Sequence, residues 1–173
     1  MPFTPFHLGP ALLFGLALSA IFDFPTILVA SVIPDLEPFC VVYFHVYNYP
    51  LHGFFHSYLG TSVLAVFVAI IIYPLRGWLD RVLTVFGISQ KSSFRKIMFT
   101  SFFGVYLHVF LDSFLYGEMN PFYPLLGNPF IHILLPYGSY SIIYGFCSLT
   151  AVLGIILYLY KTVKVRLKEK EKK

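Results

Sequence analysis

Two long stretches without any Lys or Arg constrain this chain more than any other feature. They run from Met1 to Leu75 and from Ile97 to Tyr160, and both are rich in aliphatic and aromatic residues. Hydrophobic residues make up 58% of the 173 positions and charged residues 12%, which is about half the charged share of an ordinary soluble domain. A soluble fold of this size cannot bury so much apolar surface, so we expect an integral membrane protein.

The apolar runs are continuous rather than alternating, which predicts an all-α membrane bundle and argues against a β-barrel. We expect about five transmembrane or partly inserted helices, the first two short and separated by the break Asp23-Phe24-Pro25. The predicted helices cover residues 8–22, 26–34, 57–73 (ending before Pro74), 96–116 and 140–160. Between them we expect an irregular aromatic segment at 37–51, an interfacial helix followed by a polar loop at 77–95, and a structured loop at 117–138.

The basic residues fall into two groups, Arg76 to Lys96 and Lys161 to Lys173, and these predict the orientation. Positively charged loops usually face the cytoplasm, and helices that alternate in direction place both groups on that side. The segments 37–51 and 117–138, together with the N-terminus, are then external, whereas the turn at Asp23 is internal.

We therefore expect one transmembrane domain over residues 1–160 of a multi-pass cell-membrane protein, followed by a basic cytoplasmic tail over 161–173. The tail fits a solvated segment beside anionic lipid better than a nucleic-acid contact. The N-terminus has no basic n-region, so we expect no cleavable signal peptide.

Ionisable side chains from four separate segments gather at the end of the bundle opposite the basic groups. Two pairs, His52/His56 and His108/Asp112, are four residues apart, a spacing that brings both side chains to one side of a helix. An ionisable residue within a span is costly and normally marks a site. The full set is His7, Asp35, Glu37, His52, His56, His108 and Asp112.

Imidazole and carboxylate together suit Zn²⁺, Fe²⁺ or Mn²⁺, so we interpret the set as a metal site that takes one to three ions, zinc being the first candidate. The predicted ligands are His7, Asp35, His52, His56, His108 and Asp112. Glu37, or Asp35 where it is not a ligand, is the predicted catalytic base. In the alternative, purely structural interpretation, His108 and Asp112 form a buried hydrogen-bonded pair that holds helices together. We expect His45 and His132 to be interfacial polar groups.

Short motifs occur in a specific order along residues 7 to 124. They resemble the membrane-bound, metal-dependent hydrolase family typified by the LexA-regulated, inner-membrane-associated hydrolases of bacteria, with many archaeal members. The motifs are Pro5-Phe6-His7-Leu8-Gly9-Pro10, Pro34-Asp35-Leu36-Glu37, His52-Gly53-Phe54-Phe55-His56-Ser57, His108-Val109-Phe110-Leu111-Asp112 and Gly117-Glu118-Met119-Asn120-Pro121-Phe122-Tyr123-Pro124.

The chain departs from that pattern at two places. Many members place the first histidine of the third motif five residues before the second, whereas His52 stands four residues before His56, and Asp often stands where this chain has Glu37. The resemblance implies a helical core similar to that of zinc-dependent phospholipase C and related nucleases, in which His and Asp hold several zinc ions.

These observations favour a membrane-embedded hydrolase that cleaves a phosphoester or phosphodiester of a lipid or lipid-linked substrate with a metal-activated water. No Lys or Arg lies on the external side, so metal ions have to supply the positive charge for a phosphate. A transport protein is one alternative, and it predicts polar residues that continue to the other face. A non-catalytic protein with a structural metal is another, and it predicts a closed coordination shell. The pattern of a Ser-His-Asp triad or a phosphate-binding glycine loop is absent, and we expect no nucleic-acid partner.

Overall fold

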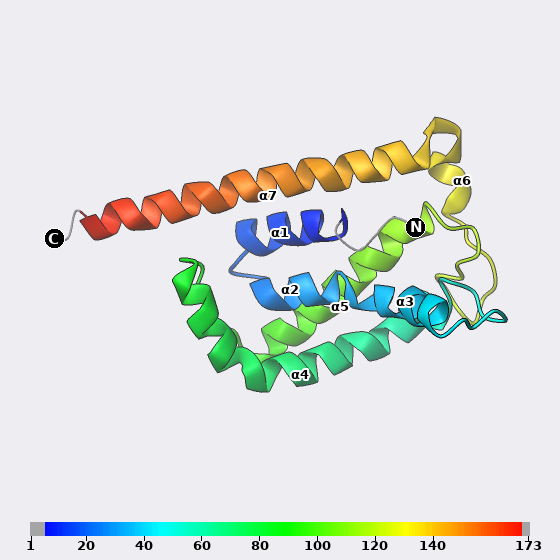
Figure 1. Ribbon diagram of the computed structural model, residues 1–173, viewed down its shortest axis with the longest axis horizontal. Helices are drawn as coiled ribbons and strands as arrows, with labels where there is room; N and C mark the ends of the chain where they lie inside the picture. The colour runs from blue at the N-terminus through cyan, green and yellow to red at the C-terminus, as the bar shows by residue number, and fades with distance from the viewer. Residues whose placement is uncertain (1–5, 171–173) are drawn as a thin grey trace.

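The computed structural model describes residues 6–170, and these form helices arranged along one long axis (Figure 1). The part of the chain so described contains no strand, and the predicted all-α fold is confirmed. The ends of the expected external N-terminus and basic tail, residues 1–5 and 171–173, lie outside it. The α-helices are α1 (Leu8–Ala17), α2 (Phe24–Ala30), α3 (Leu36–Tyr43), α4 (Tyr58–Val85), α5 (Phe94–Ser113), α6 (Ile131–Leu134) and α7 (Ser139–Lys170), and the 3₁₀-helices are η2 (Ile33–Asp35), η3 (Phe54–His56) and η4 (Leu135–Tyr137).

Four segments of the described chain are long and apolar enough to span a membrane: Phe24–Tyr43, Tyr58–Val85, Phe94–Ser113 and Ser139–Lys164. The helix α1 is also apolar, but its 10 residues extend only about 15 Å. In the most apolar window of α7, 22% of the residues are buried inside the protein, so most of its side chains face outward, as lipid contact requires. Four spans and one shorter apolar helix agree with the expected bundle.

The short helices α1 and α2 form the centre of the bundle. In Figure 1, α7 runs along one side of them and α4 and α5 along the other, and the closest packing joins α1 to α7 and α4 to α5. At Gly9 of α1 an added Cβ would lie 2.1 Å from the carbonyl oxygen of Cys147, so glycine lets α1 approach the backbone of α7. Gly104 of α5 likewise lies against Ala30 of α2, where an added Cβ would be 2.6 Å from the Ala30 Cβ.

The turn between α1 and α2 lies at the same end of the bundle as the basic loop. Asp23 caps α2 by accepting a hydrogen bond from the Thr26 amide, and its other carboxylate oxygen accepts from Arg76 Nε at 2.8 Å and from Ser92. Asp23 and Arg76 are both buried, so this ion pair joins the turn between α1 and α2 to α4 inside the protein. Lys161 of α7 donates to the carbonyl of Leu16 near the end of α1. Both basic groups therefore meet at one end, as their sequence positions predicted.

Several predicted boundaries are wrong. The first predicted helix was expected to reach residue 22 and the last to end at residue 160, but α1 ends at Ala17 and α7 continues to Lys170. The segment 37–51 was expected to be irregular, but α3 continues as helix to Tyr43, where it extends the line of α2 and completes a span. The third predicted helix was expected to end before Pro74, but α4 continues to Val85 and bends along its length (Figure 1). A proline removes one backbone hydrogen bond, which membrane helices tolerate when the neighbouring structure compensates. Continued helix after Pro74 brings Arg76 to Asp23.

Candidate metal centre

His108 projects from α5 into the bundle with a fixed ring orientation. Its Nδ1 lies 2.7 Å from the carbonyl oxygen of Ser31, which follows α2, and the close packing of Gly104 against Ala30 brings these segments together. Because a carbonyl can only accept, Nδ1 carries the hydrogen, so the neutral ring has its free electron pair on Nε2. That Nε2 lies 3.2 Å from a carboxylate oxygen of Asp112, one helical turn along α5.

His56 reaches the same point from η3, just before α4 begins. Its Nδ1 lies 2.7 Å from Glu37 Oε2, and its Nε2 lies 3.8 Å from Asp112 Oδ2 and 4.0 Å from Asp35 Oδ1. The side chain is completely buried, and burial lowers the pKa of His56, which favours the neutral ring. A neutral imidazole whose other nitrogen donates to a carboxylate is the form in which histidine binds metals.

Four electron-pair donors therefore face one another at a single point. Ligand atoms of Asp35, His56, His108 and Asp112 all lie within 4.8 Å of one another. The Nε2 atoms of both histidines are buried without a hydrogen-bond partner in the described structure. The distances from Nε2 to carboxylate oxygen are 3.2–4.0 Å, against about 3.3 Å between ligands that surround a zinc ion tetrahedrally. The residues present therefore fit a divalent cation, and this cluster could hold one.

Glu37 organises the loop that carries His56. Besides His56, its two carboxylate oxygens accept hydrogen bonds from the amides of Gly53 and Phe55 and from the hydroxyl of Tyr49. Burial and the bond to Glu37 raise the pKa of Tyr49, which keeps this hydroxyl protonated as a donor. The sequence predicted Glu37 as the catalytic base, and that role stays a prediction. Its four hydrogen bonds fit a role in orienting His56 better than a role as a catalytic base.

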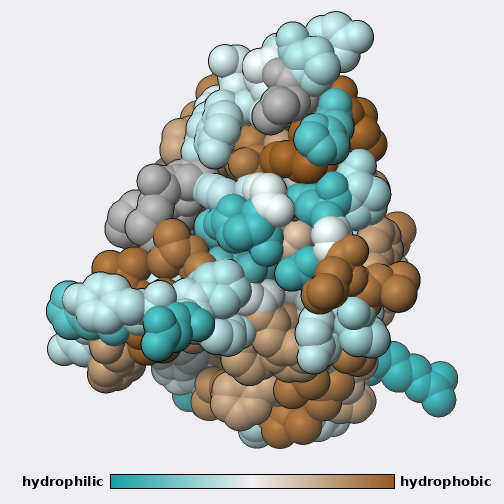
Figure 2. Space-filling model, turned by 90° about the vertical axis from the view of Figure 1, so that its right-hand side faces the viewer, coloured by the Kyte–Doolittle hydropathy of each residue, from teal (hydrophilic) through white to brown (hydrophobic). Residues whose placement is uncertain are grey.

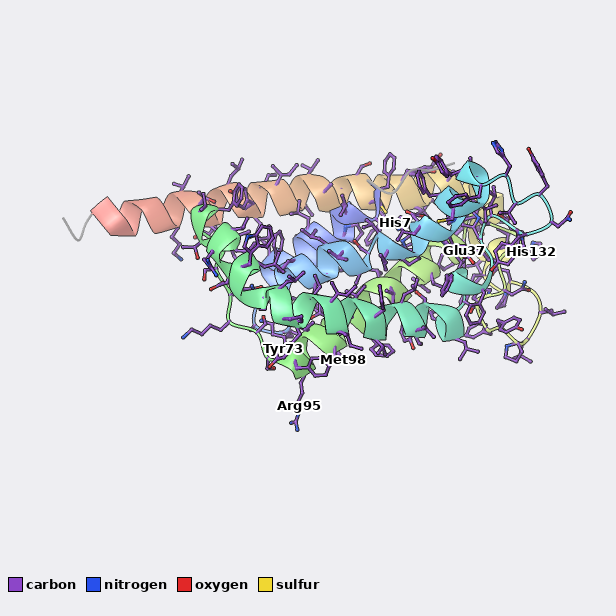
Figure 3. All side chains as sticks on the ribbon, turned by 60° about the horizontal axis from the view of Figure 1, so that its bottom comes forward. His7, Glu37, Tyr73, Arg95, Met98 and His132 are labelled. Atoms are coloured by element: carbon purple, nitrogen blue, oxygen red, sulfur yellow. The ribbon has the colours of Figure 1, made fainter. Side chains whose placement is uncertain are left out.

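His7 lies beside the four-residue group, immediately before α1. Its Nε2 lies 3.1 Å from Asp112 Oδ1, the carboxylate oxygen that does not face His108, and its ring stacks on that of His108 at 4.0 Å. Asp112 therefore contacts His108 with one oxygen and His7 with the other. Figure 3 labels His7 and Glu37, which lie at the same end of the bundle and away from Arg95.

His52 is not part of the four-residue group. Its Nδ1 lies 2.8 Å from Glu118 Oε1, its ring stacks on Tyr116 at 3.8 Å, and it meets His56 edge to face at 4.8 Å. His56 belongs to the 3₁₀-helix η3, whereas His52 lies in the bend before η3, so the expected arrangement of both on one face of an α-helix does not form. The structure brings His52 next to the centre, and its role as a metal ligand stays a prediction.

Sequence analysis missed three residues around the centre. Tyr49 supports Glu37, Glu118 holds His52, and Tyr116 has a buried hydroxyl without a hydrogen-bond partner among the described residues. Burial and the nearby charge of Asp112 raise the pKa of Tyr116, so its phenol stays protonated. Tyr116 and Glu118 follow the His108–Asp112 motif closely, and that proximity was the available signal. His45 and His132 are exposed, as expected.

The centre lies below one end face of the molecule. Asp35 keeps 15% of its side chain exposed, whereas the other three members of the group are buried. Figure 2 shows hydrophilic residues gathered near the middle of this end and hydrophobic residues on its flanks. A small polar group can therefore approach the cluster past Asp35 more easily than from within the bundle.

A family comparison agrees with this reading of the fold. The family model described as YdjM inner membrane protein matches residues 1–169. The chain belongs to the YdjM inner membrane protein family. No curated protein and no solved structure matches it. Family membership and the four apolar spans make it a multi-pass protein of the inner membrane.

The cluster predicts that protein purified in detergent without chelator carries a divalent metal, about one ion or more per chain. The double variant His108→Ala/Asp112→Ala removes two of the four donors, and we expect it to lose that metal in elemental analysis. The double variant His45→Ala/His132→Ala is the matched control, because both of its histidines are exposed. Equal metal content in the two variants would contradict the site.

The hydrogen bonds of Glu37 predict a second result. Glu37→Gln removes the charge that orients His56, and loss of such a supporting partner typically weakens metal affinity roughly 10- to 100-fold. Competition with a chromogenic chelator measures this change. Glu118→Gln, which alters the partner of His52 outside the four-residue group, should leave the affinity near that of the wild type. An unchanged metal affinity in Glu37→Gln together with lost hydrolysis would instead favour Glu37 as the catalytic base.

Proposed function

We propose that this protein is a membrane-embedded, metal-dependent hydrolase. One observation carries the proposal: two buried histidines, each fixed through Nδ1 by an oxygen acceptor, aim their free Nε2 atoms at two carboxylates. Two imidazole nitrogens and one carboxylate, from His56, His108 and Asp112, would hold a zinc ion and leave one coordination position open for water. Such an ion would lower the pKa of that water to near neutrality and would polarise a substrate ester.

The residues of the chain take different roles in this proposal. Asp35, the most exposed member of the group, stays outside the coordination shell and accepts the proton of the attacking water. Glu37 keeps the His56 ring oriented. His7 and the second carboxylate oxygen of Asp112 would supply two ligands to a further ion. Tyr116, protonated and without a partner, donates a hydrogen bond to a substrate oxygen.

The substrate we propose is a phosphoester or phosphodiester of a lipid or a lipid-linked molecule. Every Lys and Arg of the sequence falls within residues 76–96 or 161–173, and those among the described residues lie at the end of the bundle away from the centre, so a phosphate there depends on metal for its counter-charge. Asp35 and Asp112 belong to spanning segments, and Asp112 lies near the end of its span, so we expect the centre to lie close to the lipid headgroup region.

Transport of a metal ion is less well supported. A transport path needs polar groups from one end of the bundle to the other. The helices between the centre and the Asp23–Arg76 pair instead contribute a packed apolar cluster of Ala30, Ala65 and Val105, each fully buried. Each of these residues lies, along its own helix, between the two polar ends.

Hydrolysis is tested with purified protein and short-chain phosphatidylcholine, with released phosphate ester as the readout. We expect activity that a chelator abolishes and added Zn²⁺ restores. Asp35→Asn should lower kcat by roughly 10²- to 10⁴-fold, the usual contribution of a positioned base. His45→Ala serves as the control. A structural metal predicts stoichiometric zinc without any chelator-sensitive turnover of phosphoesters, and that result would refute the proposal.

We further propose that the centre faces the outside of the cell, because both basic groups lie at the opposite end. Leu126 and Phe86 are exposed in loops at the two ends. In a Cys40→Ala background, a membrane-impermeant maleimide should label Leu126→Cys in intact cells and Phe86→Cys only after permeabilisation. Labelling in the reverse order would put the centre in the cytoplasm.

A further inference from the structure

A cavity of about 430 Å³ lies beside the centre, between α3 and the beginning of α4. Its walls are almost entirely apolar and include Ile33, Leu36, Cys40, Phe44 and Leu64. The volume is within the range of small-molecule and cofactor sites, about 300–1,000 Å³. We call this cavity the α3 groove.

The groove follows the axis of α3. Ile33, Leu36, Cys40 and Phe44 recur every three or four residues, which places them on one face of a helix. The helix α3 completes the span Phe24–Tyr43 and continues from α2 toward the end of the bundle at which the centre lies (Figure 1). A ligand in the groove therefore lies beside a membrane-spanning segment, where the alkyl chains of lipids are also found.

The groove shares a wall with the metal centre. Glu37 and Phe55 line it, and the same Glu37 holds the ring of His56 while accepting a hydrogen bond from the Phe55 amide. Pro34 lines the groove, whereas Asp35, the next residue, belongs to the four-residue group. One short segment thus presents a carboxylate to the centre and apolar surface to the groove.

The chemistry of the lining selects an apolar occupant. Glu37 is the one charged residue that lines it, and both of its carboxylate oxygens are already engaged in hydrogen bonds. Tyr49, the other polar side chain near this wall, donates its hydroxyl hydrogen to Glu37. Neither group is free to bind a sugar or a nucleotide, whereas an alkyl chain needs only the apolar surface.

We propose that the α3 groove binds one alkyl chain of the lipid substrate and thereby holds the ester linkage of that lipid at the metal centre. This inference rests on the proposed hydrolase function and adds the position of the chain. Binding energy from a part of the substrate that does not react is then used to position the part that does.

Photo-cross-linking tests binding in the groove without hydrolysis. The full chain is reconstituted in nanodiscs that contain a trace of phospholipid with a diazirine at its chain terminus, and cross-linked peptides are mapped by mass spectrometry. We expect cross-links to concentrate on the α3 peptide. Cys40→Trp, which fills the groove, should lower them several-fold. Ile70→Trp, a substitution of the same final size at an exposed position of α4, should leave them unchanged.

Leu64→Trp fills the same groove from α4 and should reproduce the effect of Cys40→Trp, which separates occupancy of the groove from a local defect in α3. Cross-links spread evenly over the lipid-facing helices, or equal in the Cys40→Trp and Ile70→Trp variants, would overturn the proposal.

A kinetic measurement connects the groove to turnover. Cys40→Trp should lower kcat/KM for a long-chain phosphodiester several-fold and leave that for a short-chain analogue near the wild-type value. An equal loss for both substrates would overturn the positioning role. Absence of any hydrolysis by the wild type would refute the proposed function, and the cross-linking result would then decide on chain binding in the groove by itself.

Discussion

The cost of burying charge inside a membrane governs the arrangement of this protein. Ionisable groups inside the bundle have to find partners there, because neither lipid nor the apolar core provides them. The chain meets this requirement with two polar clusters at opposite ends. At one end Asp23 and Arg76 form a buried ion pair, and at the other end two carboxylates meet two histidines. The first cluster pairs a cation with a carboxylate, whereas the second, with its histidines neutral, could hold a cation.

The electron-donor cluster depends on interactions outside it. Ser31 and Glu37 fix the two histidine rings through hydrogen bonds to Nδ1, and they belong to one segment that runs from the end of α2 to the first turn of α3. That segment reaches α5 because Gly104 permits close contact with Ala30. Helix packing at the middle of the bundle therefore determines the direction in which His108 Nε2 points, and the same segment also forms a wall of the α3 groove.

Much of the fold and of the candidate site could be predicted from the sequence. The spans were readable from uncharged apolar runs, and the i,i+4 spacing of His108 and Asp112 placed both on one side of α5, where they lie 3.2 Å apart. The boundary at Pro74 could not be predicted, because a packed membrane bundle compensates for the missing hydrogen bond of a proline. The contact between His52 and Glu118 could not be predicted either, because it joins residues 66 positions apart in the sequence. The same spacing that succeeded for His108 failed for His52, because η3 interrupts helical geometry before α4.

The sequence by itself determined that this is a helical membrane protein with its basic residues at one end and the seven candidate site residues at the other. Hydrophobicity, helix length and the order of motifs are local properties that need no knowledge of packing. Only the tertiary structure decided which of the seven ionisable residues form the four-membered group and which support it. That distinction depends on ring orientation and on distances of a few ångströms between helices, and these are set by the close approach of small residues and by hydrogen bonds across the bundle.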